Sequence, residues 1–184
     1  MSRPLPFLIV GLPRSRTAWL AAFLTEGAVM CHHELLARCH NAQEFCDKLH
    51  DPRYEVVGDS DPNIPTYYPF LMPALGPHKV IFVDRDEKEA HAASDRFMAN
   101  EVGITPPVGA FDAIVARYKA MKDFCVDFMA FSFGDLDDMD KCRQLAEYAT
   151  EQPFNEDRWQ LFNQLRVTVI PQKAYAHVLN KEKH

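Results

Sequence analysis

A glycine and two arginines follow the first apolar run of the chain, in an arrangement that suits anion binding. Residues 7–10 (Phe-Leu-Ile-Val) form a continuous apolar run ending in Gly11, which is typical of a strand buried on both faces. We expect a helix from about residue 15 to 25, so the loop between them offers unpaired N–H groups and the positive end of a helix dipole. The loop also carries charged and hydroxyl side chains: Arg14, Ser15, Arg16 and Thr17. The sequence therefore predicts a phosphate-binding loop, with a solvated basic loop as the alternative.

This loop does not match the nucleotide loop of ATP- and GTP-hydrolysing enzymes. In the pattern G-x-x-x-x-G-K-[ST] begun at Gly11, Arg16 replaces the second glycine and Thr17 replaces the lysine. Ala18 stands where a hydroxyl would hold magnesium. Phosphoryl transfer from ATP relies on that lysine and that metal ligand, so this activity is disfavoured. Sulfuryl transfer fits better, because it proceeds without a bound metal.

The stretch Gly-Leu-Pro-Arg-Ser-Arg-Thr-Ala-Trp-Leu, residues 11–20, resembles the 5′-phosphosulfate loop of sulfotransferases, typically Pro-Lys/Arg-Ser-Gly-Thr-Thr-Trp/Leu-Leu. The resemblance implies the cofactor 3′-phosphoadenosine 5′-phosphosulfate, with Arg14 bridging the leaving phosphate and the transferred sulfuryl group. It also implies adenine stacking on Trp19, for which core packing against Phe23 is the alternative. Arg16 stands where the family prefers glycine. The implied cofactor contacts are Pro13, Arg14, Ser15, Arg16, Thr17, Ala18 and Trp19.

A second stretch resembles the 3′-phosphate motif of the same family. Residues 79–86 (Lys-Val-Ile-Phe-Val-Asp-Arg-Asp) read as a strand ending in arginine, followed by a helix that contains Ser94. The resemblance implies that Arg85 pairs with the 3′-phosphate and that Ser94 adds a hydroxyl; an ion pair at the sheet edge is the alternative for Arg85. Glu87 replaces the usual proline, and Ser94 lies one position later than the family places it. The C-terminal Arg-Lys-Gly-type segment that clamps the 3′-phosphate is not visible.

Three titratable residues follow the second expected strand. A hydroxyl acceptor needs a base within hydrogen-bond reach, and the family uses histidine or glutamate. Glu34 lies about twenty residues beyond Arg14, as in the tyrosylprotein branch, so we expect Glu34 to be the base, with His33 second and His32 third. A helix-starting acidic residue is the alternative for Glu34. We expect the acceptor to enter over residues 32–73, a segment whose aromatic residues include Tyr67, Tyr68 and Phe70.

The elements expected around these motifs alternate. Short strands are expected at 7–10, 28–31, 54–57, 79–84 and 126–133, and helices at 15–25, 41–49, 87–100, 111–122, 137–150 and 155–165. Residues 62–77 are rich in proline and aromatics, so turns and one short helix are expected there. This order predicts a three-layer α/β/α domain, P-loop-like, with a mostly parallel sheet of about five strands. In such sheets ligands bind beyond the carboxyl ends of the strands, where the three motifs fall.

Composition limits the remaining possibilities. The 184 residues fit one domain, spanning 1–184 with a tail expected to fray from about 180, and the net charge of −6 disfavours a nucleic-acid partner. No apolar run suits a signal peptide or membrane helix, so we expect a cytoplasmic protein. Cys31 and Cys39 lie near histidines, but no second ligand pair follows, so no metal site is expected.

Two functions from different classes remain open. One is a sulfotransferase that acts on a small-molecule hydroxyl acceptor, which the residues do not name. The other is a binding module of the same fold that keeps a phosphate or nucleotide pocket but has lost turnover. Arg16, the missing proline and the absent clamp favour the second, whereas the loop motif favours the first.

Overall fold

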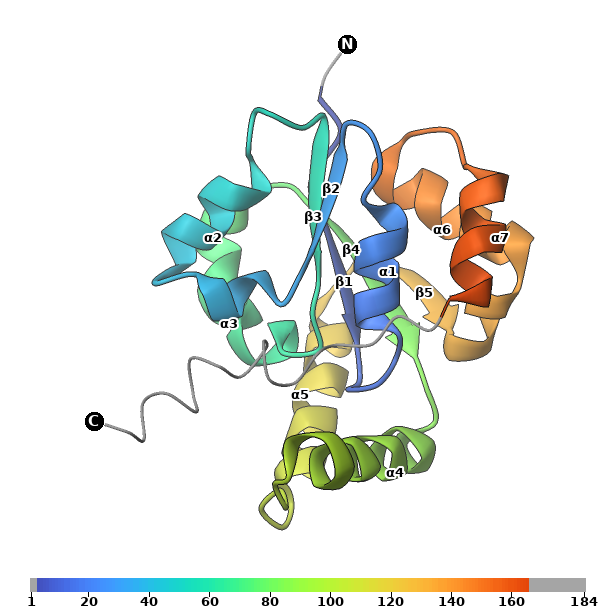
Figure 1. The fold of residues 1–184 in the computed structure, drawn as a ribbon. Coiled ribbons are helices and arrows are strands. Elements are labelled where there is room, and N and C mark those ends of the chain that lie inside the picture. Colours follow the sequence, from blue (N-terminus) through green and yellow to red (C-terminus); the bar gives the residue numbers. More distant parts are fainter. Residues whose placement is uncertain (1–2, 166–184) are drawn as a thin grey trace.

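The computed structural model describes residues 3–165, which form a parallel five-stranded sheet covered by helices on both faces (Figure 1). The strands are β1 (Phe7–Gly11), β2 (Val29–His33), β3 (Val56–Ser60), β4 (Lys79–Asp84) and β5 (Met129–Ser132). Their order is β2-β3-β1-β4-β5, and every adjacent pair is parallel. The predicted three-layer α/β fold is confirmed. The tail expected to fray lies outside the described residues.

Alternate side chains of the central strands enter two separate cores. On one face, Leu8, Val10 and Phe82 pack under α2 (Ala42–Leu49), α3 (Ile64–Leu75) and α5 (Ala110–Phe124). On the other, Phe7, Ile9 and Ile81 pack under α1 (Thr17–Leu24) and α6 (Met139–Thr150), with α7 (Glu156–Gln164) outside them. Because successive strand side chains point to opposite faces, a run such as residues 7–10 must be apolar throughout.

The chain leaves β1 and β4 toward opposite faces of the sheet. After β1 it enters α1 on one face. After β4 it runs through α4 (Glu87–Phe97), the π-helical turn Met98–Val102 and then α5 on the other face. Figure 1 shows α4 lying beyond the carboxyl edge of the sheet. The neighbouring strands β1 and β4 therefore open a crevice between their following segments, the usual place for a ligand in such sheets.

Residues 64–75 form a longer helix than the sequence predicts. α3 continues for 12 residues although Pro65 lies in its first turn and Pro69 and Pro73 lie inside it. Each internal proline removes one backbone hydrogen bond, but both are exposed, so water can satisfy the carbonyls they leave. The opposite side buries Tyr68 and Leu71 against the core, and this packing outweighs the poor local propensity.

Several other helices and strands begin or end a few residues away from the positions expected from the sequence. β3 begins and ends later than expected, because Gly58 and Asp59 continue the pairing with β1 rather than turning. The strand expected at 126–133 shrinks to β5 and is followed by the 3-10 turn Phe133–Asp137, and another 3-10 turn, Leu35–Arg38, follows β2. α2 begins as predicted, since the Asn41 side chain accepts a hydrogen bond from the Glu44 backbone N–H at 2.9 Å.

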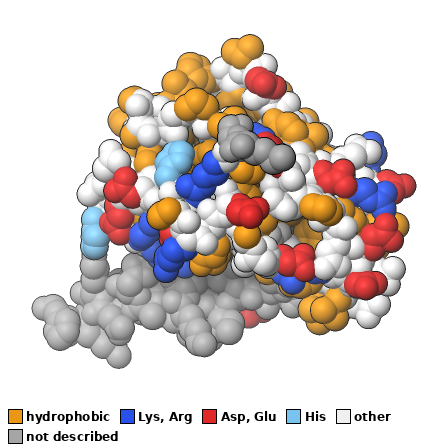
Figure 2. Space-filling model, turned by 90° about the horizontal axis from the view of Figure 1, so that it is seen from above, with side chains coloured by type: hydrophobic (Ala, Val, Ile, Leu, Met, Phe, Trp, Pro, Cys, Tyr) orange, Lys and Arg blue, Asp and Glu red, His pale blue; other side chains and the backbone are white. Residues whose placement is uncertain are grey.

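The surface at the amino edge of the sheet is mixed in character. Figure 2, a view from above Figure 1, shows basic and acidic side chains interspersed among apolar ones, without one dominant charge. None of the helices within residues 3–165 is long and apolar enough to cross a membrane.

Candidate functional site

The loop between β1 and α1 has two residues in the left-handed region of backbone conformation. Arg14 has φ 69° and Arg16 has φ 59°, and the Ser15 N–H donates to the Leu12 carbonyl at 3.1 Å. Arg16 is the N-cap of α1, yet its side chain makes no capping hydrogen bond. The loop wraps around the start of the helix, where backbone N–H groups and the dipole favour an anion.

Three guanidinium groups gather around this loop. Arg85, at the end of β4, donates from Nη1 to the Arg14 carbonyl and stacks over the Phe133 ring, 4.2 Å from its centroid. Arg16 lies 5.2 Å from the same centroid and pairs with Asp137 at 2.6 Å. The Arg14 guanidinium lies 4.4 Å from the centroid of Phe97 in α4. Arginine side chains from one loop and one strand end therefore meet at the carboxyl edge of the sheet.

Several positively charged side chains lie close together at this loop. Burial lowers the pKa of Arg85, the Glu89 carboxylate opposes that change, and the neighbouring Arg14, Arg16 and Arg96 charges lower the pKa further. Within the described part of the chain, the buried Ser15 Oγ and Arg85 Nε have no hydrogen-bond partner. Donors left without acceptors in a positive environment are what an anionic ligand would satisfy.

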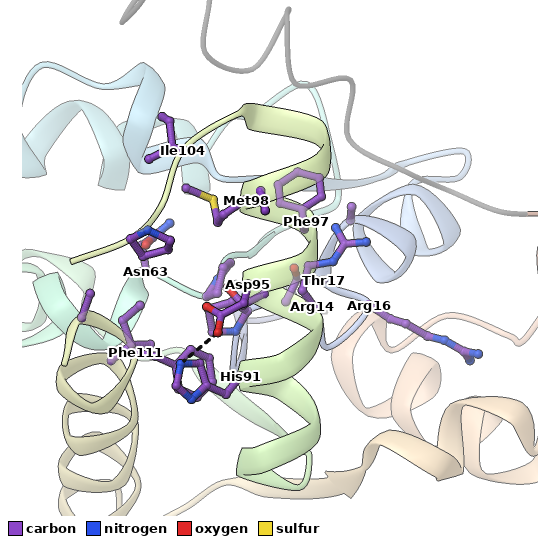
Figure 3. Close-up of a pocket in the computed structure, with 18 of the residues that line it drawn as sticks. Arg14, Arg16, Thr17, Asn63, His91, Asp95, Phe97, Met98, Ile104 and Phe111 are labelled. Atoms are coloured by element: carbon purple, nitrogen blue, oxygen red, sulfur yellow. Dashed lines mark ion pairs between the residues drawn. The ribbon is translucent and has the colours of Figure 1, made fainter. Parts of the chain in front are cut away.

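A cavity of about 1110 Å³ opens beside the loop. Its walls come from the loop and α1, from the ends of β2 and β3, and from α4 with the connection to α5; residues near the end of α7 complete it. Figure 3 shows Arg14 and Thr17 facing α4 across this space, while the Arg16 side chain runs away from it. Arg16 is thus held toward Asp137 rather than toward the cavity.

The structure brings most of the sequence-predicted cofactor residues to this cavity. Pro13, Arg14, Arg16, Thr17, Ala18, Trp19 and Ser94 all line it, whereas Arg85 and the fully buried Ser15 do not. Arg85 supports the loop through the Arg14 carbonyl and is not beside Ser94 in the wall. Trp19 is 5% exposed, stacks on Phe23 with centroids 4.9 Å apart, and donates from Nε1 to the Phe162 carbonyl at 2.9 Å. Most of its ring therefore belongs to the core.

The candidate bases differ in their surroundings. His33 and Glu34 line the cavity, and His32 does not. The His33 Nε2 atom lies 3.3 Å from Thr17 Oγ1, and burial, followed by the Arg38 charge, lowers the pKa of His33 to about 4. Burial raises the pKa of Glu34, with Arg38 opposing it. A carboxylate with a raised pKa is the stronger proton acceptor of the two.

Two buried aspartates lie close enough to Glu34 for their charges to interact. Asp59 and Asp61 are inaccessible to solvent, and each accepts a backbone N–H with one oxygen, from Leu35 at 3.2 Å and from Asn63 at 2.6 Å. Their second oxygens have no partner among the described residues. Burial, and then the Asp61 charge, raises the pKa of Asp59, while burial and Glu34 raise the pKa of Asp61 to about 6. The segment Gly58-Asp59-Ser60-Asp61-Pro62 predicts either a turn or, at Asp59, a contact with the acceptor, and it does not reveal that the two aspartates are buried.

The cavity wall formed by α4 and α5 was also missed. His91 stacks on Phe111 with centroids 4.4 Å apart and lies 3.5 Å from the Asp95 carboxylate, as Figure 3 shows. The available signal was the four-residue spacing of His91 and Asp95 on one helix face. By contrast, Tyr67 and Phe70 are exposed outside this cavity, and Tyr68 is buried with its hydroxyl 3.0 Å from His78. Of the expected acceptor segment, the residues that line the cavity are His33, Glu34, Pro62 and Asn63.

Across residues 3–165, no three histidine, cysteine, aspartate or glutamate side chains form a group that could hold a metal ion. Comparison with protein-family models and with curated proteins gives no match to this chain. Its function must therefore be inferred from the geometry of the loop and the cavity.

Proposed function

We propose that this protein is a sulfotransferase-like enzyme that uses 3′-phosphoadenosine 5′-phosphosulfate and transfers its sulfuryl group to a hydroxyl acceptor. The proposal combines the loop motif at Gly11–Thr17 with the cavity beside it. The chain's own residues supply an anion site, a proton acceptor and space for a second ligand.

The observation that carries the proposal is the meeting of Arg14, Arg16 and Arg85 at the uncapped start of α1. The Arg16 and Arg85 guanidinium groups both stack on the Phe133 ring, the Arg14 guanidinium stacks on the Phe97 ring, and Arg16 also pairs with Asp137. The positive charges of these side chains favour an anion at the loop. The buried hydroxyl of Ser15 adds a donor without an acceptor. This donor set suits a phosphosulfate, with no need for a metal ion.

Each residue has a distinct task in this proposal. When bound, the phosphosulfate supplies an activated sulfuryl group, and its 5′-phosphate is the leaving group. Arg14 stabilises the charge that grows on that phosphate. Glu34 accepts the acceptor hydroxyl's proton, and its raised pKa suits that role. Thr17 and Ser94 offer hydroxyl donors from opposite walls of the cavity.

The second candidate function is a binding module without turnover. One specific observation favours it: the Arg85 guanidinium already donates to the Arg14 carbonyl and packs on Phe133. Fewer of its N–H groups are therefore available to donate to a 3′-phosphate. Such a module would hold an anion at the loop but discriminate poorly between nucleotides with and without a 3′-phosphate.

The test is calorimetric titration of 3′-phosphoadenosine 5′-phosphate into the intact protein without magnesium. We expect micromolar binding that is lost in Arg14→Ala and kept in Arg53→Ala, a control that removes an exposed arginine whose described contacts are with Asp51 and Tyr54 and which does not line the cavity. Adenosine 5′-phosphate is titrated in parallel, because a preference for the bisphosphate measures the 3′-phosphate contact.

The outcomes separate the candidates. Equal affinity for the two nucleotides would favour the binding module. No binding at millimolar concentration, with the variants folded by circular dichroism, would refute the nucleotide site altogether.

A further inference from the structure

The first residue of α1 and the last residue of β2 meet at the wall of the cavity. Thr17 Oγ1 lies 3.3 Å from His33 Nε2, and both residues line the cavity beside the β1–α1 loop. Figure 3 shows Thr17 next to Arg14, on the side of the cavity that faces α4. An anion bound by this loop therefore meets a hydroxyl that already has a histidine partner.

The position of the His33 ring is fixed by the sheet rather than by the loop. His33 pairs with Ser60 in the parallel register of β2 and β3, and its carbonyl accepts a hydrogen bond from the Arg38 guanidinium. Burial, followed by the Arg38 charge, lowers the pKa of this ring to about 4, so the ring is neutral at neutral pH. A neutral imidazole carries one N–H and one unprotonated nitrogen, and it can present either of them at Nε2.

The two forms of the ring have opposite effects on Thr17. If Nε2 is unprotonated, the Thr17 hydroxyl donates its single hydrogen to the ring and presents lone pairs to the cavity, which repel an anion. If Nε2 carries the proton, the ring donates to Oγ1, and the Thr17 hydrogen can then be donated to an anion. Thr17 is 5% exposed, so solvent offers its hydroxyl few other partners.

We propose that His33 is a positioning residue for the anion site, which donates from Nε2 to Thr17 Oγ1 and so directs the Thr17 hydroxyl toward an oxyanion at the β1–α1 loop. The oxyanion is sulfate, phosphate or the phosphate group of a nucleotide, whose oxygens accept this hydrogen bond. In this arrangement Nε2 of His33 holds a proton, so Glu34 is left as the proton acceptor on this wall. The inference rests on the proposed function for the presence of an anion at the loop.

The experiment measures how the two side chains depend on each other in anion binding. Sulfate, which has no proton to donate at neutral pH, is titrated by NMR at constant ionic strength, and 3′-phosphoadenosine 5′-phosphate is titrated by calorimetry. We expect Thr17→Val to weaken binding of both anions about tenfold, and His33→Phe to weaken it by about three- to tenfold. Because His33 acts through Thr17, His33→Phe should change the affinity by less than about twofold in the Thr17→Val background. His33→Gln, whose amide N–H can replace that of Nε2, should retain most of the affinity.

Nitrogen-15 NMR of the histidine rings gives a second readout, which a contact with a merely structural role would not move. With sulfate bound, Nε2 of His33 should be protonated and Nδ1 unprotonated. This state is read in the wild-type protein, so it decides the question even where a variant does not fold. His40→Phe is the matched control, since His40 is exposed and outside the cavity, and it should leave both affinities unchanged.

The outcomes distinguish this inference from the proposed function. A bound form with Nε2 unprotonated, or equal losses from His33→Phe in both Thr17 backgrounds, would overturn the inference and leave nucleotide binding intact. Coupling seen with sulfate, but with no tighter binding of the bisphosphate, would support the inference and overturn the proposed cofactor. Absence of binding by both anions would overturn the inference and the proposed function together.

Discussion

The ion pair between Arg16 and Asp137 determines how much positive charge the β1–α1 loop offers to an anion. Its atoms are 2.6 Å apart, with 32% and 57% of the two side chains exposed. An exposed ion pair of this kind stabilises the folded protein by about 0.2–1 kcal/mol. An anion that draws Arg16 away from Asp137 must break this pair, so its binding free energy is less favourable by the same amount. Asp137→Asn should therefore tighten binding of 3′-phosphoadenosine 5′-phosphate by up to about fivefold.

Calorimetry on four proteins tests the reasoning: the wild type, Asp137→Asn, Arg16→Gln and the double variant. If the gain arises from released Arg16, Asp137→Asn should have little effect in the Arg16→Gln background. The gain should also shrink in about 0.5 M salt, where charges in solvent are screened. An equal gain in both backgrounds would mean that Asp137 acts only through its general charge. Weaker binding in Asp137→Asn would refute the idea that this pair restrains Arg16.

Three further predictions concern the fold around the site. Gly58→Ala should destabilise the protein by about 1–3 kcal/mol in urea unfolding, because a Cβ there would lie 2.2–2.4 Å from the buried Phe7 ring; unchanged stability would contradict the β1–β3 register. Asp61→Asn should gain stability relative to wild type by about 3 kcal/mol between pH 4 and pH 7, since burial raises the pKa of Asp61 from 3.8 to about 6 and the folded state binds the extra proton in that window; a pH-independent difference would show that Asp61 titrates normally. Asn41→Ala should cost about 1 kcal/mol and lower Tm by roughly 2–4 °C, through loss of the cap that receives the Glu44 N–H, whereas Asn41→Ser should retain most of the stability.

Short sequence patterns predicted the elements correctly where burial on both faces of a strand or a helix cap determines the local structure. The apolar run before Gly11 and the strand at Lys79–Asp84 were predicted at their observed places, and so was the helix that follows the N-cap Asn41. α3 was underestimated because its stability comes from packing against other elements, which the local proline content does not reveal.

The site was predicted only in part for a similar reason. The loop and its location at the carboxyl edge followed from the order of strand, glycine and helix. The support that Arg85 gives to the Arg14 carbonyl depends on which strands are neighbours, and the sequence does not state that β4 lies beside β1. The burial of Asp59 and Asp61 likewise depends on β3 lying between β2 and β1.

The position of β1 in the sheet also has a consequence for the order in which the chain can assemble. β1 is synthesised first, yet it pairs with β3 and β4 and not with β2. Its loop gains the Arg85 contact only after residue 85 has been made, and the Arg16 partner Asp137 comes later still. Contacts so distant in sequence close large loops, which slows their formation. A nascent chain that ends near residue 75 would thus contain the whole β1–α1 loop and lack the contacts that shape it, so the proposed anion site would form only later in synthesis.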